Sequence, residues 1–315
     1  MSSAGQFAVV FPGQGSQSVG MMSSFADSAV VRNTFAEASD ALGQDLWQLA
    51  AEGPVDALSQ TINTQPVMLT AGVATWRAWL EQGGARPVLL AGHSLGEYAA
   101  LVAADVLEFA EAVKLVRFRA EAMQEAVPAG EGGMAAILNL SPELVEEACV
   151  EAAQGQSVAA ANLNSPVQIV IAGHAAAVER AMEACKTRGA KRAVSLPVSA
   201  PFHSVLMKPA AERLAERLAT TRFSAPRIPV LNNVDVKIES DPVAIRDALV
   251  RQAYSPVRWI ETVEAMTAQG LAGVLEFGPG KVLAGLVKRI NAELAVEAVI
   301  DAEALKRVVA QYRQV

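Results

Sequence analysis

The chain has 315 residues, of which 52% are hydrophobic, and its formal net charge is −7. That length allows one large domain, or a large domain carrying a smaller one, and no apolar run reaches the ~18 residues that a membrane-spanning helix needs. The acidic balance, without a dense Lys/Arg cluster, argues against a nucleic-acid-binding surface. No basic stretch precedes the first apolar run, so the N-terminus predicts a strand rather than a signal peptide. Cys149 and Cys185 leave a disulfide open, but a reduced, cytoplasmic setting is the simpler interpretation.

The first part of the chain alternates strand-like and helical patterns. Short apolar runs at 7–11 and 87–91 each lead into a glycine-containing turn, which predicts buried strands. Helical patterns cover 17–40 and 65–82, and 95–126 indicates two consecutive helices. Strands that alternate with helices predict a mainly parallel sheet with helices on both faces.

The middle of the chain, between Pro128 and Pro197, changes pattern to the order βαββαβ, which is the ferredoxin-like split unit. These six stretches are 134–140, 142–153, 157–163, 168–173, 175–188 and 190–197. Further helices and strands then follow at 205–219, 228–233, after Pro242, and at 273–278. We therefore predict an α/β fold, with a hydrolase-like large domain of parallel sheet (1–128 and 198–315) and an inserted ferredoxin-like subdomain (129–197).

A nucleophile motif follows the second predicted strand. Gly92-His93-Ser94-Leu95-Gly96 fits G-x-S-x-G and is followed at once by a helix-forming run. In a nucleophile elbow the glycines permit a sharp turn, which exposes the serine at the N-terminus of a helix. The alternative is a glycine-lined turn with an incidental serine, but the strand and helix around it favour Ser94 as a nucleophile.

A serine nucleophile needs a base, and the chain has only three histidines: His93, His174 and His203. His93 adjoins the serine and is expected to point away from it, and His174 is expected at the start of a helix. By elimination His203 is the base, although a structural role remains the alternative. Between Ser94 and His203 the only Asp is Asp105, on the far side of a helix, so we predict a Ser-His dyad oriented by another group.

An arginine occupies an apolar helical face. At spacings of three, four and seven from Arg119 all neighbours are apolar, whereas Arg117 has Glu121 as an i,i+4 partner. A buried guanidinium needs an anion. Either a structural ion pair or a substrate carboxylate, bound through two parallel hydrogen bonds, would supply it.

The first loop, Phe11–Gln17, lacks the patterns of nucleotide-binding loops. An acyl-transfer site needs a second backbone N–H from such a loop, so Gln14 is the natural partner of Leu95 in an oxyanion hole.

Together these motifs resemble bacterial malonyl-CoA:acyl carrier protein transacylases over nearly the whole chain. The matching segments are FPGQGSQ, GHSLGE, the helix with Arg119, APFH, TQP at 64–66, NLNSP at 162–166, NNVD at 232–235, RQ at 251–252 and FGPGKVL at 277–283. The resemblance implies transfer of malonyl from malonyl-CoA to the phosphopantetheine thiol of holo acyl carrier protein, by ping-pong kinetics through an ester on Ser94.

The resemblance also implies residue roles. Ser94 is the nucleophile, His203 the base, and the main-chain carbonyl of Gln252 orients His203. Arg119 holds the malonyl carboxylate, and Gln14 and Leu95 form the oxyanion hole. It further places three residues in the substrate site, namely Phe202, Gln65 and Asn162.

We expect a cytoplasmic acyltransferase of fatty acid synthesis that needs no metal or cofactor and contacts neither nucleic acid nor membrane. The acidic carrier would meet a basic rim, for which the chain offers Lys191, Arg192, Lys208, Lys281, Lys288 and Arg289. Three alternatives remain: a serine esterase or thioesterase on the same elbow, a malonyl transacylase serving polyketide synthesis, and a non-catalytic interaction module that kept the fold.

Overall fold

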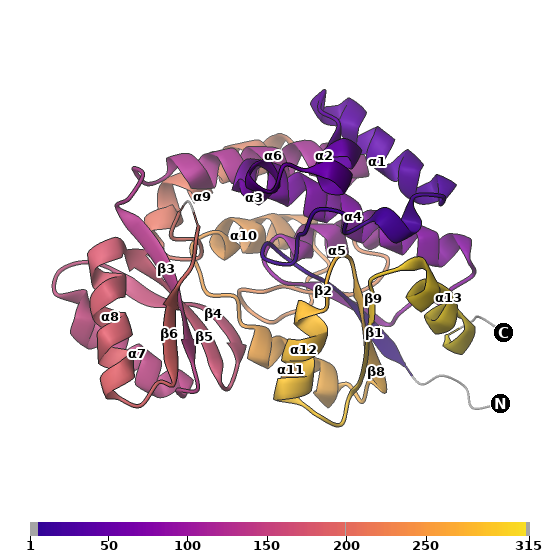
Figure 1. Ribbon diagram of the computed structural model, residues 1–315. Coiled ribbons are helices and arrows are strands. Elements are labelled where there is room, and N and C mark those ends of the chain that lie inside the picture. Colours follow the sequence, from indigo (N-terminus) through magenta and orange to yellow (C-terminus); the bar gives the residue numbers. More distant parts are fainter. Residues whose placement is uncertain (1–5, 199, 313–315) are drawn as a thin grey trace.

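The structure, a computed structural model, describes residues 6–198 and 200–312 and contains two sheets (Figure 1). The larger has five parallel strands in the order β7-β2-β1-β8-β9. Its strands are β1 (Phe7–Phe11), β2 (Leu89–Gly92), β7 (Val230–Leu231), β8 (Gly273–Phe277) and β9 (Ala295–Val299). The smaller sheet consists of β3 (Gly132–Leu138), β4 (Val158–Ser165), β5 (Gln168–His174) and β6 (Arg192–Ser195).

Helices surround both sheets (Figure 1). Those of the first part of the chain are α1 (Ala29–Leu42), α2 (Leu46–Glu52), α3 (Val55–Ser59), α4 (Thr61–Glu81), α5 (Gly96–Ala103) and α6 (Phe109–Glu125). Two belong to the smaller sheet, α7 (Pro142–Ala153) and α8 (Ala175–Thr187). The rest are α9 (Lys208–Thr220), α10 (Pro242–Gln252), α11 (Trp259–Ala268), α12 (Val282–Ile290) and α13 (Ala302–Gln311). None of the described helices is long and apolar enough to cross a membrane.

The larger sheet is buried on both faces, as predicted. Successive side chains of a strand point to opposite faces, and β1 divides accordingly. Phe7, Val9 and Phe11 join the apolar core formed with α1, α4 and α6. Ala8 and Val10 join a second core formed with α11 and α12. Figure 1 shows these two groups of helices on opposite sides of the sheet.

The smaller sheet has the predicted ferredoxin-like order. Its strands run β4-β5-β3-β6, each antiparallel to its neighbours, and α7 and α8 cover one face. Ala135 and Ile137 of β3 face those helices, whereas Met134 belongs to the core of the large domain. The second sheet thus shares its other face with the parent fold. All its strands lie within 129–197; the domain boundaries themselves stay a prediction.

Several predicted bounds were wrong. The helix predicted at 65–82 begins at Thr61, so Pro66 lies inside α4. Where helical patterns were predicted to cover 17–40, a short 3₁₀ turn (Ser23–Phe25) precedes α1, which begins only at Ala29. The strand predicted at 228–233 keeps only two residues. Short elements such as α2 and α3 complete only one or two turns, which is too little for a periodic pattern to stand out.

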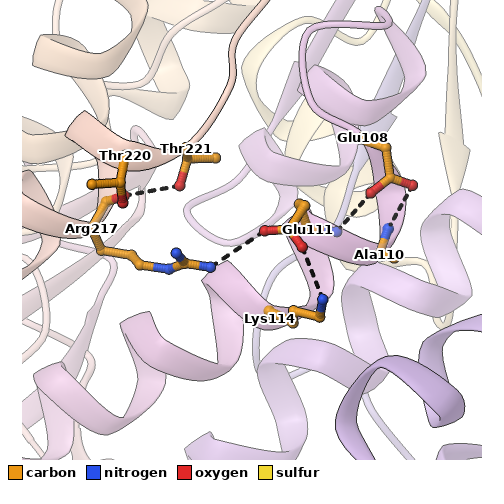
Figure 2. A network of polar contacts seen from close by, with 7 residues as sticks. All are labelled: Glu108, Ala110, Glu111, Lys114, Arg217, Thr220 and Thr221. Atoms are coloured by element: carbon orange, nitrogen blue, oxygen red, sulfur yellow. Dashed lines mark hydrogen bonds and ion pairs between the residues drawn. The ribbon is translucent and has the colours of Figure 1, made fainter.

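Polar contacts at the surface connect α6 to α9 (Figure 2). Glu108 caps α6 by accepting from the N–H groups of Ala110 and Glu111. The Glu111 carboxylate pairs with Lys114 at 2.9 Å and with Arg217 of α9 at 3.4 Å. Exposed pairs of this kind contribute about 0–1 kcal/mol each. The apolar face of α6 therefore does more than these pairs to fix the helix that carries Arg119.

Candidate active site

The motif around Ser94 forms a nucleophile elbow between β2 and α5. Ser94 has a φ of 52°, in the left-handed region that non-glycine residues rarely adopt. A Cβ on Gly92 would lie 1.9 Å from the carbonyl carbon of Gly96, and one on Gly96 would lie 2.0 Å from the Phe11 oxygen. Asn233 closes the turn, since its Oδ1 accepts from the Ser94 N–H at 2.6 Å and its Nδ2 donates to the Gly92 oxygen at 2.6 Å.

We expect Gly92→Ala to lower the free energy of unfolding by about 3 kcal/mol or more, because a methyl group cannot fit against the Gly96 backbone. Thermal denaturation measures the loss, and acylation of Ser94 should fall with it. The matched control is Gly285→Ala in α12, where a Cβ meets nothing within 4 Å, and which should stabilise by about 0.5–1 kcal/mol. Equal melting temperatures for the two variants would contradict this explanation.

Ser94 and His203 meet as the sequence predicted. Ser94 Oγ lies 2.7 Å from His203 Nε2, and His203 Nδ1 lies 2.9 Å from the main-chain oxygen of Gln252. The latter contact makes Nδ1 the protonated nitrogen, so Nε2 is free to accept a proton. A carbonyl thus takes the place of the acid in a triad. His93 instead contacts Asn164 through Nε2 at 2.8 Å, and His174 is the N-cap of α8.

Arg119 reaches the same place from α6. Its side chain is buried, with Nη1 donating to Gln65 Oε1 at 2.7 Å and Nη2 donating to Gln252 Oε1 at 3.0 Å. Nη2 also lies 3.2 Å from Ser94 Oγ. Within residues 6–198 and 200–312 no carboxylate forms an ion pair with this guanidinium, which disfavours the structural ion pair. Burial accordingly lowers the pKa of Arg119.

A cavity of ≈ 120 Å³ joins these groups at the interface between the two sheets. The remaining predicted residues Gln14, Gln65, Leu95, Asn162 and Phe202 all line it. In the described part of the chain, the N–H groups of Gln14 and Leu95 have no protein acceptor, as an oxyanion hole requires. Sites for drug-sized ligands measure about 300–1,000 Å³. The smaller cavity therefore suits a short acyl group.

Three polar residues of the site were given no role by the sequence. Thr61 donates to Gln14 Oε1 at 2.7 Å, and Glu97 and Asn233 hold the elbow from behind. The segments GHSLGE and NNVD contain the last two, so the matching segments marked them without saying what they contact. Burial raises the pKa of Glu97 to about 7.

An elbow serine paired with a histidine, beside a buried cation in a small cavity, defines a serine-dependent acyl-transfer enzyme. Residues 8–311 match the model of the acyl transferase domain. The malonyl CoA-acyl carrier protein transacylases of Salmonella typhimurium and Bacillus subtilis are 58% and 45% identical to the chain, covering 97% and 96% of it and 99% and 95% of their own lengths. The chain therefore belongs to the acyl transferase family and, within it, to the malonyl CoA-acyl carrier protein transacylases.

Solved structures agree with this assignment. An acyl carrier protein S-malonyltransferase from Vibrio cholerae superposes with a TM-score of 0.94 at 58% identity, covering 96% of this chain and 99% of that one. A malonyl-transacylase in complex with a type II PKS acyl carrier protein gives a TM-score of 0.96 at 56% identity, covering 97% of this chain and 99% of that one. The two-domain α/β fold is thus that of known malonyl transacylases.

Proposed function

We propose that this protein transfers a malonyl group from malonyl-CoA to the phosphopantetheine thiol of acyl carrier protein, through an ester on Ser94. The observation that carries the proposal is the position of Ser94 Oγ, 2.7 Å from the base His203 and 3.2 Å from the guanidinium of Arg119. One atom is thereby placed to attack a thioester whose acyl group ends in a carboxylate.

Acylation begins when malonyl-CoA enters with its carboxylate on Arg119, whose planar fork accommodates both oxygens. His203 Nε2 takes the proton of Ser94 Oγ as that oxygen attacks the thioester carbonyl. The N–H groups of Gln14 and Leu95 stabilise the oxyanion of the tetrahedral intermediate. Its collapse breaks the C–S bond, and coenzyme A leaves with the proton from His203.

Deacylation reverses these roles for the second substrate. The carrier's thiol gives its proton to His203 and attacks the malonyl-Ser94 ester, and the Ser94 oxygen leaves and recovers the proton. Free coenzyme A departs before the carrier reacts, so the kinetics are ping-pong. No step calls for a metal or a cofactor.

We expect the acylation rate to stay constant between about pH 5 and pH 8. Burial and the charge of Arg119 lower the pKa of His203 to about 3, so the imidazole remains the neutral, active base over that range. Glu97 titrates near neutrality but retains an acceptor oxygen in either form. The measurement is kcat/KM for malonyl-CoA against pH. A fall centred near the ordinary histidine value of about 6.5 would contradict it.

We propose that the protein serves fatty acid synthesis, and polyketide synthesis is the second candidate because one similar structure contains a type II PKS carrier protein. An acidic carrier would approach the six basic residues of the predicted rim, all of them exposed. We place the protein in the cytoplasm. The free, buried thiols of Cys149 and Cys185 support this, and burial raises the pKa of Cys149 to about 12.

Intact-protein mass spectrometry after brief incubation with malonyl-CoA tests the proposal. We expect a malonyl adduct on the wild type that holo carrier protein discharges. An adduct that decays equally fast without the carrier would identify a thioesterase instead. The absence of any adduct would contradict the proposal that malonyl-CoA is the acyl donor.

A further inference from the structure

Glu97 lies behind the nucleophile, in the first turn of α5, and its side chain is 2% exposed. One carboxylate oxygen, Oε2, accepts two hydrogen bonds: from the N–H of Asn233 at 2.9 Å and from Nε2 of Gln252 at 2.8 Å. The residue does not line the cavity that contains Ser94, so it is out of reach of an acyl group there. Whatever it does for the reaction must pass through its two donors.

Gln252 connects Glu97 to the groups that face the cavity. Its Nε2 also donates to the Ser94 main-chain oxygen at 3.1 Å, and its Oε1 accepts from Arg119 Nη2 at 3.0 Å. An amide has a donor end and an acceptor end, so these contacts fix its direction. Turned around, it would present N–H groups to a guanidinium and an oxygen to a carboxylate, which are two unfavourable contacts.

The Glu97 carboxyl also interacts with the charge of Arg119. Within residues 6–198 and 200–312, that buried guanidinium donates to uncharged oxygens, namely the amide oxygens of Gln65 and Gln252 and the Ser94 hydroxyl. Glu97 lies one amide away from it, on the other side of Gln252. The attraction is mutual, since Arg119 lowers the pKa of the Glu97 carboxyl against the larger effect of burial.

We propose that Glu97 is a positioning residue for malonyl selectivity: by fixing the Gln252 amide it holds the Arg119 guanidinium where the acyl carboxylate binds. The inference rests on the proposed function and adds to it a residue that never touches the substrate. It follows that Glu97 matters for donors that carry a carboxylate and much less for donors that do not.

The experiment measures single-turnover acylation of Ser94 by malonyl-CoA and by acetyl-CoA at pH 8, using mass spectrometry. The variants are Glu97→Met, Glu97→Gln, Gln252→Met and the double variant with both methionines. Gln252→Met keeps the carbonyl that orients His203. We expect each single methionine variant to lower the malonyl-to-acetyl rate ratio about 10- to 100-fold, the effect of losing a hydrogen bond to a charged group. Glu97→Gln keeps an acceptor oxygen, so its malonyl-to-acetyl rate ratio should stay within about 5-fold of the wild-type ratio.

The double variant distinguishes a positioning role of Glu97 from a general loss of structure. If Glu97 acts through Gln252, the double variant should lose no more of the ratio than Gln252→Met alone. The control is Glu276→Met, which removes another buried carboxylate, one that caps α12 through the N–H groups of Leu283 and Ala284. It should lower stability without changing the ratio.

Equal losses with both donors in Glu97→Met, or additive effects in the double variant, would overturn the inference. If Glu97→Met fails to fold, Gln252→Met provides the test instead. An unchanged malonyl-to-acetyl rate ratio in Gln252→Met would show that the Gln252 amide does not position Arg119, and would overturn the inference. A wild type that forms no malonyl adduct would refute the proposed function itself, and that result is read before any variant is compared.

Discussion

Ser94→Ala will form no malonyl adduct and will lower malonyl transfer by at least about 10⁴-fold, because no other group can take the place of the nucleophile. His203 would remain beside the cavity with nothing to deprotonate. The adduct is measured by intact-protein mass spectrometry, and transfer by the appearance of malonyl carrier protein. The change removes one oxygen atom, so the melting temperature should hardly move.

Ser59→Ala, at an exposed position at the end of α3, is the matched control and should behave as wild type. If Ser94→Ala gained the same added malonyl mass as the wild type, in the same yield, another side chain would carry the acyl group. Transfer without any adduct would replace the ping-pong route by direct attack of the carrier thiol on malonyl-CoA.

Arg119→Ala will lower acylation by malonyl-CoA about 30- to 5,000-fold, while acylation by acetyl-CoA stays within about 10-fold of wild type. Losing one partner of a buried charge pair costs about 2–5 kcal/mol, and each 1.4 kcal/mol is a factor of ten. Acetyl has no carboxylate and does not depend on that pair. Rates of adduct formation with the two donors give the comparison.

Arg117→Ala controls for loss of an arginine from α6. Arg117 is only half-buried and contacts the side chains of Gln44 and Asn63, away from Ser94. The Arg117→Ala variant should lower acylation by malonyl-CoA and by acetyl-CoA only slightly, and by the same factor. Near-full malonyl transfer by Arg119→Ala would mean that the carboxylate binds elsewhere, and would revive the esterase interpretation, which has no use for this arginine.

The chain's periodic segments were predictable from sequence. β1 was predicted with its observed bounds and α7 likewise, and the βαββαβ order of the smaller sheet emerged from pattern alone. Helices α11, α12 and α13 and strand β9 were not predicted. Strand β9 completes the sheet, α11 and α12 supply its second core, and α13 joins the first core. Each of these elements has at most ten residues, which is too short for a periodic pattern to stand out.

Ser94 was identifiable because an elbow is a local structure: a strand, a glycine-bounded turn and a helix, all within about fifteen residues. Elimination among three histidines then selected His203, and an all-apolar neighbourhood singled out Arg119. The sequence also indicated that no acid completes a triad, because the only Asp between Ser94 and His203 is Asp105, on the far side of a helix. These are properties of residue type and spacing, which the sequence carries directly.

Only the tertiary structure decided what surrounds these groups. The carbonyl of Gln252 reaches His203 across 49 positions of sequence, and the Gln252 amide reaches Glu97 across 155. Backbone carbonyls and amide side chains occur everywhere in a sequence, so nothing in their type or spacing marks the ones that meet. The sequence by itself determined the reacting groups, whereas the packing of α5, α6 and α10 around the elbow selected the hydrogen bonds that orient them.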